Sequence, residues 1–209
     1  MSFWSERVLP PVIEAVCSGA GPTKHRSEVV PLAEGRTLDL GIGSGLNLGF
    51  ADAARIESWV GIDPSPALLA RARERATQAR FPVELVEGRG ERLPFDQASF
   101  DSVVVTYTFC SVEDPGATAA EIARVLKPGG KVLFAEHGVA ERPFARGVQH
   151  RLDPGWRRVA GGCSLDRDFV GTMLDTRRFV VESLRLRETF PKWMSTVRSG
   201  VLRGAVTRS

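Results

Sequence analysis

The stretch Arg36-Thr37-Leu38-Asp39-Leu40-Gly41-Ile42-Gly43-Ser44-Gly45 decides the fold, because it joins a buried strand to a glycine-rich turn. Glycines at 41, 43 and 45 let the backbone approach a ligand more closely than any side chain would allow. The spacing is GxGxG, with Leu46 where the dinucleotide-binding fingerprint GxGxxG has its third glycine. The turn therefore predicts a ligand site at the end of a strand, with a pattern unlike that of nicotinamide-dependent dehydrogenases.

Strand and helix patterns alternate on both sides of this turn. Strands are expected over 36–40, 58–62, 83–86, 102–106, 131–136, 180–187 and 201–206, and helices over 3–17, 66–80, 115–126 and 166–175. This order predicts a doubly wound α/β fold with a mostly parallel, seven-stranded sheet that ends in an antiparallel C-terminal hairpin. Ligands of such sheets bind beyond the carboxyl ends of the strands, where the strand order reverses.

The length of 209 residues suits one domain, so we expect 1–209 to fold as a unit. Residues 1–30 are expected to form an N-terminal helical cover, with a loop over 18–24. Residues 138–165 are rich in Arg, Gly and Pro, look irregular and are a candidate substrate lid. No apolar run approaches the ~18 to 20 residues of a membrane span and no secretory leader is visible, so we expect a cytoplasmic protein with no integral membrane segment.

The net charge of +3 is too small to indicate a nucleic-acid partner. The charge is unevenly distributed, because residues 142–209 hold 14 Lys and Arg against 6 Asp and Glu, and residues 1–141 hold 14 against 19. A basic C-terminal third suits an anionic substrate or an acidic surface, or it is a solvated face.

Cysteine and histidine spacing gives no metal motif. Cys17, Cys110 and Cys163 contain no CxxC pair, and His25, His137 and His150 lack ligand spacing; the odd cysteine count fits a reducing compartment. We therefore predict no metal.

Two carboxylates accompany the glycine turn. Asp39 lies two residues before it, where a carboxylate can reach a cationic amino group. Asp63 ends the next strand, 18 residues after Gly45, where an acidic side chain can accept from ribose hydroxyls or cap the following helix.

Three further motifs carry a family resemblance: Glu87-Gly88-Arg89-Gly90-Glu91-Arg92-Leu93-Pro94-Phe95, the pair Phe100-Asp101, and Leu126-Lys127-Pro128-Gly129-Gly130. In this order they resemble class I methyltransferases of the ubiquinone/menaquinone-biosynthesis type, which implies S-adenosylmethionine as cofactor. The first motif lines the adenine in that family and departs here at Arg89, so the resemblance points to the Gly90 backbone and the Glu91 side chain as adenine neighbours.

A more specific resemblance covers nearly the whole chain. Cys110-Ser111-Val112, Glu136-His137 and Leu152-Asp153-Pro154-Gly155-Trp156 with Gly162-Cys163 are similar to the methyltransferase-like alkyl-thiol methyltransferases of animals and their bacterial relatives. The resemblance implies methylation of an aliphatic thiol or hydrogen sulfide.

His137 and Tyr107 are the candidate catalytic residues. His137 follows the fifth strand. Because the pKa of a histidine can lie near working pH, His137 suits a base or a substrate-orienting group, or it only hydrogen-bonds backbone at the strand end. Tyr107 follows the fourth strand and either packs or points its hydroxyl at the substrate. The predicted cofactor-binding set is Asp39, Gly41, Ile42, Gly43, Gly45, Asn47, Asp63, Pro64, Gly90, Glu91 and Thr106.

Three other functions stay open. The acceptor is alternatively a phospholipid amine, a quinone precursor or a natural product, methylated on N, O or C. A non-catalytic protein that binds S-adenosylmethionine is a reading of another class. A nicotinamide-dependent oxidoreductase is disfavoured by Leu46 and by the 126–130 motif.

Overall fold

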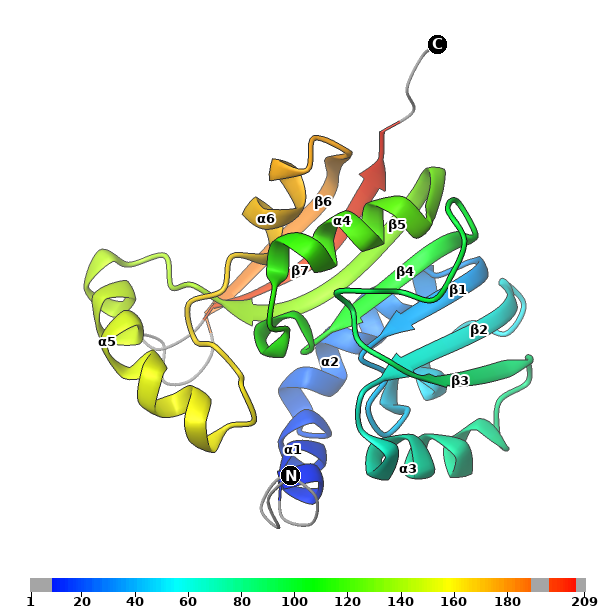
Figure 1. Ribbon diagram of the computed structural model, residues 1–209, viewed down its shortest axis with the longest axis horizontal. Coiled ribbons are helices and arrows are strands. Elements are labelled where there is room, and N and C mark those ends of the chain that lie inside the picture. Colours follow the sequence, from blue (N-terminus) through cyan, green and yellow to red (C-terminus); the bar gives the residue numbers. More distant parts are fainter. Residues whose placement is uncertain (1–8, 189–195, 206–209) are drawn as a thin grey trace.

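The computed structural model describes residues 9–188 and 196–205, and its centre is one seven-stranded sheet (Figure 1). The strand order is β3-β2-β1-β4-β5-β7-β6. The strands are β1 (Gly35–Leu40), β2 (Ile56–Asp63), β3 (Val83–Glu87), β4 (Phe100–Thr106), β5 (Leu126–Gly138), β6 (Phe179–Glu188) and β7 (Thr196–Gly204). The first five are parallel, and β7 runs antiparallel to both β5 and β6. This confirms the predicted fold class, and the order reverses between β1 and β4.

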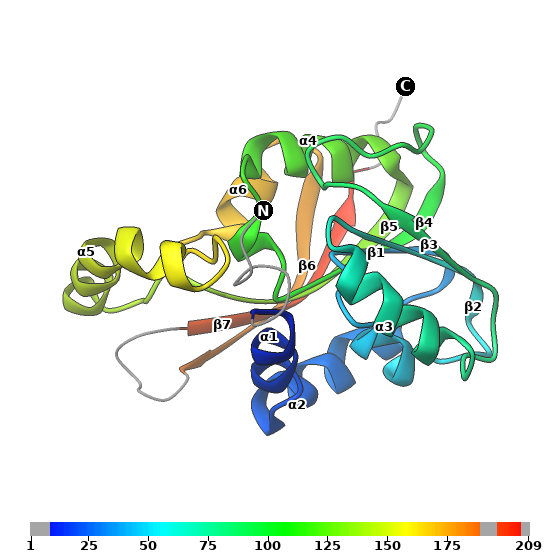
Figure 2. The ribbon, with the colours of Figure 1, turned by 60° about the horizontal axis from the view of Figure 1, so that its bottom comes forward.

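Helices cover both faces of the sheet (Figure 2). On one face, α4 (Pro115–Val125) and α6 (Phe169–Asp175) bury Ile122 and Met173 against β4 and β5. On the other, α2 (Ala20–Val29), α3 (Pro66–Ala76) and the 3-10 turns η2 (Val30–Leu32) and η3 (Leu46–Phe50) pack around Trp59. The valines of β4 alternate between the two cores, as expected for a strand that is buried on both sides.

The N-terminal segment differs from the expected pattern. α1 (Leu9–Cys17) lies within the predicted helix, whose first residues, 3–8, are outside the described part of the chain. The loop predicted over 18–24 is wrong, because α2 already begins at Ala20. Pro22 misled the interpretation: it lies in the first turn of α2, where a missing N–H removes no intrahelical bond.

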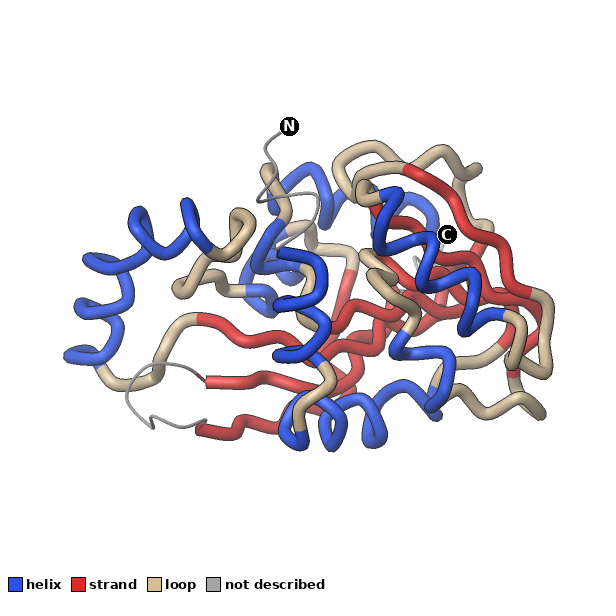
Figure 3. The backbone as a smooth tube through the Cα atoms, turned by 90° about the horizontal axis from the view of Figure 1, so that it is seen from below, coloured by secondary structure: helices blue, strands red, loops and turns tan. Residues whose placement is uncertain are grey.

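The segment 138–165 is also more regular than predicted. It contains α5 (Pro143–Val159), a 17-residue helix that includes Pro154. Figures 1 and 3 show α5 beyond the end of β5, apart from the strands. Two buried side chains attach it: Gln149 Nε2 donates to the carbonyls of Gly138 (3.1 Å) and Leu165 (2.9 Å), and Asp153 accepts from the Leu165 N–H at 2.6 Å.

Other boundaries shift by smaller amounts. β5 already begins at Leu126 and β7 at Thr196, earlier than expected, and α3 ends at Ala76. Val206, the last residue of the predicted final strand, lies outside the described residues. Over residues 9–188 and 196–205, none of the helices combines the length and the apolar character that a membrane crossing requires.

Candidate active site

A pocket with a volume of about 260 Å³ lies at the carboxyl ends of β1, β2 and β4, where the strand order reverses. Its wall includes most of the predicted cofactor set and one of the two candidate catalytic residues: Gly41, Ile42, Gly43, Asn47, Asp63, Pro64, Gly90, Glu91, Thr106 and Tyr107. The sequence therefore located the pocket, although lining it does not assign a role to any of these residues.

The glycine turn forms one side of the pocket through backbone that only glycine adopts readily. Gly41 and Gly43 have φ values of +65° and +57°. The N–H groups of Gly41 and Ile42 both donate to the carbonyl of Ile62, at 2.8 and 3.1 Å, which fixes the turn against β2. A Cβ on Gly41 would overlap the Thr108 side chain, whereas a Cβ on Gly43 would meet nothing closer than a carbonyl at 3.9 Å. The missing side chain of Gly43 thus leaves space at the pocket wall that a ligand could fill.

Asp63 faces the glycine turn from the end of β2. Its Oδ2 accepts from the Gly43 N–H at 3.0 Å, and its Oδ1 accepts from the Ser65 N–H at 2.9 Å. Burial raises the pKa of this carboxyl group, while the two N–H donors oppose that shift. Each carboxylate oxygen can accept further bonds, so Asp63 can still receive hydroxyl donors from a ligand in the pocket.

Asp39 lies behind the turn instead of in the pocket wall. Its carboxylate is fully buried and accepts from Asn47 Nδ2 at 2.8 Å and from Trp59 Nε1 at 3.3 Å. Burial raises the pKa of Asp39 to about 7, although both donors lower it. This geometry therefore does not favour direct contact between Asp39 and the amino group of a ligand. Asp39 holds Asn47, and Asn47 lines the pocket.

Arg26 is a pocket residue that sequence reasoning missed. This buried side chain of α2 donates from Nε to Asn47 Oδ1 at 3.0 Å and from a terminal nitrogen to the Cys17 carbonyl at 2.5 Å. Thr106 Oγ1 donates to the same Asn47 oxygen at 3.1 Å. Because no sequence pattern around Arg26 indicates burial, only the folded chain shows that this residue lines the pocket.

Tyr107 lines the same part of the pocket, but its hydroxyl group is engaged. It forms a hydrogen bond with Nδ1 of His25, and Arg26 lies over its ring at 5.3 Å from the centroid. Burial raises the pKa of the phenol above its usual range. Tyr107 also has a φ of +55°, an uncommon conformation for a residue with a side chain. In the structure, Tyr107 thus packs against Arg26 and bonds His25.

Helices α1 and α3 are joined beside the glycine turn. Glu14 of α1 pairs with Arg71 and with Arg75 of α3, the latter at 2.5 Å, and Arg75 also donates to the Ser44 carbonyl at 2.5 Å. Arg75 and Arg71 hold the pKa of Glu14 below its usual range. These contacts fix α1 against α3 and the glycine turn, beside the pocket.

The opposite side of the pocket contains the predicted adenine neighbours. Glu91 Oε1 accepts from the N–H groups of Glu113 (2.7 Å) and Asp114 (3.4 Å), which ties this loop to the start of α4. Arg89, at the position where the sequence departs from the family motif, forms an exposed ion pair with Glu113 at 2.5 Å.

Two other predicted residues are absent from the described pocket wall. Gly45 turns the chain into η3, and a Cβ there would lie 3.2 Å from Ala72 of α3, so its role is close packing. His137 points away toward Cys163, with 3.2 Å between Nε2 and Sγ. The geometry therefore gives no support to His137 as a base that acts directly in this pocket.

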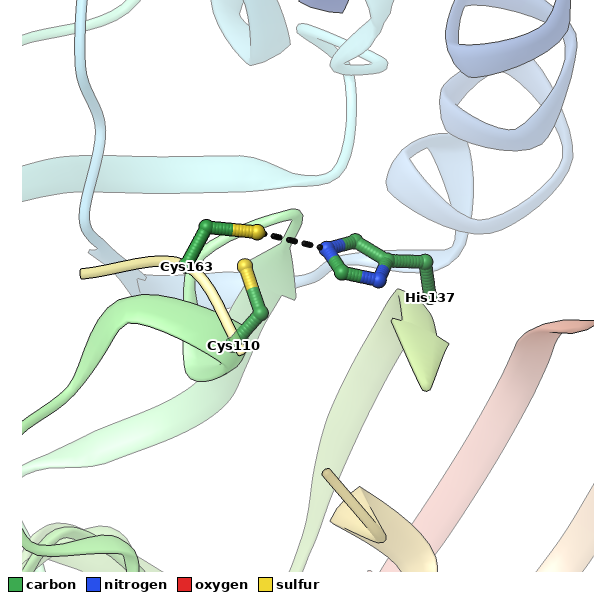
Figure 4. A group of neighbouring side chains, drawn as sticks. All are labelled: Cys110, His137 and Cys163. Atoms are coloured by element: carbon green, nitrogen blue, oxygen red, sulfur yellow. Dashed lines mark hydrogen bonds between the residues drawn. The ribbon is translucent and has the colours of Figure 1, made fainter. Parts of the chain in front are cut away.

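His137 belongs to a cluster with Cys110 and Cys163 (Figure 4). The two Sγ atoms and a ring nitrogen of His137 all lie within 4.8 Å of one another. The neighbouring Cys110 thiol and burial raise the pKa of Cys163. Spacing arguments missed the cluster because its members are far apart in the sequence, and it brings the prediction of no metal into question.

Comparison with known proteins places the chain among methyltransferases. A family profile described as "Methyltransferase domain" matches residues 38–134. Thiol S-methyltransferase TMT1B of Rattus norvegicus is 32% identical over 136 residues, which cover 63% of this chain and 54% of that protein. Phosphatidylethanolamine N-methyltransferase of Cereibacter sphaeroides is 35% identical over 133 residues, which cover 63% and 64%.

The chain thus matches between about half and two thirds of the length of these two relatives. An uncharacterized Mycobacterium tuberculosis protein, Rv1405c, is 31% identical over 197 residues, covering 88% of this chain and 67% of that protein. The crystal structure of YcgJ protein from Bacillus subtilis shares the fold, with a TM-score of 0.65 at 20% identity, over 85% of this chain and 94% of that one.

The family profile is that of a methyltransferase domain, and two of the relatives are named as methyltransferases. The seven-stranded sheet, with a glycine-lined pocket where its strand order reverses, is consistent with that assignment. The chain belongs to the class I S-adenosylmethionine-dependent methyltransferases.

Proposed function

We propose that this protein transfers a methyl group from S-adenosylmethionine to a small-molecule acceptor, with an aliphatic thiol or hydrogen sulfide as the first candidate. The observation that supports the proposal most is the pocket itself. It combines a glycine turn with free space beside Gly43, a carboxylate at Asp63 and a buried guanidinium at Arg26.

The residues present fit the cofactor. Asp63 would accept from the ribose hydroxyls, since its Oδ2 faces the glycine turn and both its oxygens can accept further hydrogen bonds. The Gly90 backbone and Glu91 would border the adenine, and Arg26 supplies a buried cation for the carboxylate of the methionine part. When bound, S-adenosylmethionine would supply an electrophilic methyl group to the acceptor lone pair, and S-adenosylhomocysteine would remain as the product.

A thiol acceptor is supported by the relation to TMT1B and by the chemistry of the wall. A thiol has a pKa near ~8.5, so part of it is thiolate at neutral pH and no strong base is required. The described lining residues include no histidine, which suits such an acceptor. The segment 138–165 contributes Gly161 to the wall, and we propose that the loop after α5 borders the acceptor.

An amine acceptor is the second candidate, favoured by the 35% identity to a phosphatidylethanolamine N-methyltransferase. A protein that binds S-adenosylmethionine without using it is the remaining alternative. The location in the cytoplasm stays a prediction.

An acceptor panel tests these proposals. The protein is incubated with S-adenosylmethionine and a mixture of alkyl thiols, sulfide, amines, phenols and phospholipids, and methylated products are identified by mass spectrometry. We expect methyl thioethers or methanethiol. Turnover with an amine or a phenol but with no thiol would reject the thiol assignment, and tight cofactor binding with no S-adenosylhomocysteine formed from any acceptor would favour the binding protein.

Replacement of Asp63 by alanine is expected to weaken S-adenosylhomocysteine binding by ~1.5 to 3 kcal/mol, because hydrogen bonds to a charged acceptor contribute about that much. Isothermal titration calorimetry measures the change. Exposed Asp52→Ala, in the loop before β2, is the matched control and should bind as the wild type does. Unchanged affinity in a folded Asp63→Ala protein would mean that the ribose lies elsewhere.

A further inference from the structure

We infer that Cys110, His137 and Cys163 bind a divalent cation of the zinc class and leave one coordination position open to an exogenous ligand. Two thiolates and an imidazole are ligands that zinc prefers, at about 2.3 Å from sulfur and about 2.0 Å from nitrogen. These lengths require ligand atoms roughly 3.5 to 3.8 Å apart in a tetrahedral site. Here all three atoms lie within 4.8 Å of one another, and Cys163 Sγ is 3.2 Å from His137 Nε2.

Hydrogen bonds to the backbone hold the first ligand in place. Cys110 lies on the 3-10 turn η4 (Phe109–Ser111), at whose start Glu136 Oε1 accepts from the N–H groups of Thr108 (2.7 Å) and Phe109 (3.0 Å). Glu136 is itself buried on β5, immediately before His137, so the same strand positions two of the ligands.

The third ligand is brought in by a tight turn after α5. Gly161 and Gly162 have φ values of +63° and +86°, which bend the chain just before Cys163. The Ser164 N–H then donates to the Cys110 carbonyl at 2.8 Å, so the two cysteine segments are joined directly. Gln149 and Asp153 of α5 hold Leu165 beside them. The ligands are therefore positioned without a metal, and a cation requires only side-chain shifts of about 1 Å.

The cluster adjoins the pocket. Ser111, next to Cys110, and Gly161, two residues before Cys163, both line the pocket wall. Three protein ligands with a free fourth position are typical of catalytic zinc sites, whereas structural sites use four. Because Ser111 and Gly161 separate the cluster from the pocket only by their own width in the chain, we place the open position on the side of the cluster that borders the pocket.

This position gives the cation a role that rests on the proposed function. A thiol acceptor that binds there exchanges its S–H bond for a sulfur–metal bond, its proton passes to solvent, and the metal keeps its oxidation state. The acceptor is then held as a thiolate beside the methyl donor.

Cobalt(II) titration of the full chain, after chelator treatment and under reducing conditions, tests the site. We expect one cobalt per chain, thiolate-to-metal charge-transfer absorption and the visible bands of tetrahedral cobalt, all displaced by zinc. Absence of stoichiometric binding, or spectra without thiolate ligation, would overturn the inference.

A pair of matched variants tests whether Cys163 is a ligand. Cys163→Ser, at a partly exposed position, is expected to fold, to lose charge-transfer intensity and to bind cobalt at least about tenfold more weakly. Cys17→Ser, which removes the cysteine outside the cluster, should keep the wild-type spectrum. Circular dichroism verifies the fold of each variant. A Cys163→Ser spectrum equal to that of the wild type would exclude this site.

The cobalt spectrum also tests whether the acceptor binds to the metal. An alkyl thiol should shift the cobalt bands of the wild type, whereas an alcohol of the same length should not, and a thiol without effect would reject the acceptor role. Calorimetry with S-adenosylhomocysteine measures the cofactor pocket separately, so failure of the metal site and failure of the proposed function give different results.

Discussion

Replacement of Gly41 by alanine is expected to destabilise the protein by roughly 2 to 5 kcal/mol and to abolish measurable cofactor binding. Two costs combine: alanine must adopt a φ of +65°, and its Cβ must displace the Thr108 side chain. Thr108 also donates from Oγ1 to the Gly41 carbonyl at 3.1 Å, so this contact is lost when the two segments separate.

Urea unfolding and calorimetry with S-adenosylhomocysteine measure the two effects. Gly147→Ala is the matched control, because Gly147 lies inside α5 and a Cβ there meets nothing within 4 Å. That variant should be unchanged or up to about 1 kcal/mol more stable, since alanine favours helix. A Gly41→Ala protein with wild-type stability and affinity would show that the turn tolerates a Cβ beside Thr108, which contradicts the packing described for Gly41.

Replacement of Arg26 by methionine is expected to weaken S-adenosylhomocysteine binding by roughly 2 to 5 kcal/mol. The proposed pair joins the Arg26 guanidinium to the ligand carboxylate, and removing one partner of a buried charge pair usually costs that much. The guanidinium is the buried cation of the wall, and it also orients Asn47, which in turn donates to Asp39. Methionine retains much of the side-chain volume but none of the donors.

A second ligand separates a direct contact from a structural effect. Methylthioadenosine lacks the amino-acid part, so its affinity should change little in Arg26→Met if the guanidinium binds the ligand carboxylate. Arg73→Met, on the exposed side of α3, is the control for charge alone and should bind both ligands normally. Equal losses for both ligands would assign Arg26 a purely structural role.

The glycine turn and Asp63 could be located from the sequence because their signals are local. A side-chain-free turn after a hydrophobic strand, followed by an acid at the end of the next strand, has one arrangement in a doubly wound sheet. The positions of Gly41, Gly43 and Asp63 in the structure agree with it. The error at 138–165 arose because Pro154 and the glycines of α5 suggested a loop, although Phe144, Val148, Leu152 and Trp156 recur at helical spacing.

Arg26 and the Cys110–His137–Cys163 cluster could not be located in this way. Nothing near Arg26 in the sequence indicates burial, because its partners Asn47 and Cys17 come from other segments. For Asp39 the sequence suggested contact with a ligand, because this residue lies just before the turn. Only the structure shows that its two oxygens accept hydrogen bonds from Asn47 and Trp59 instead.

By itself the sequence determined the sheet, the glycine turn and the carboxylate after β2, because backbone conformation and hydrophobic periodicity depend on residues close together in the chain. Only the tertiary structure decided which charged and sulfur-bearing side chains meet at the pocket. These side-chain contacts depend on how α2, β5 and the turn after α5 pack at one edge of the sheet. No short-range sequence pattern encodes the distances between these elements.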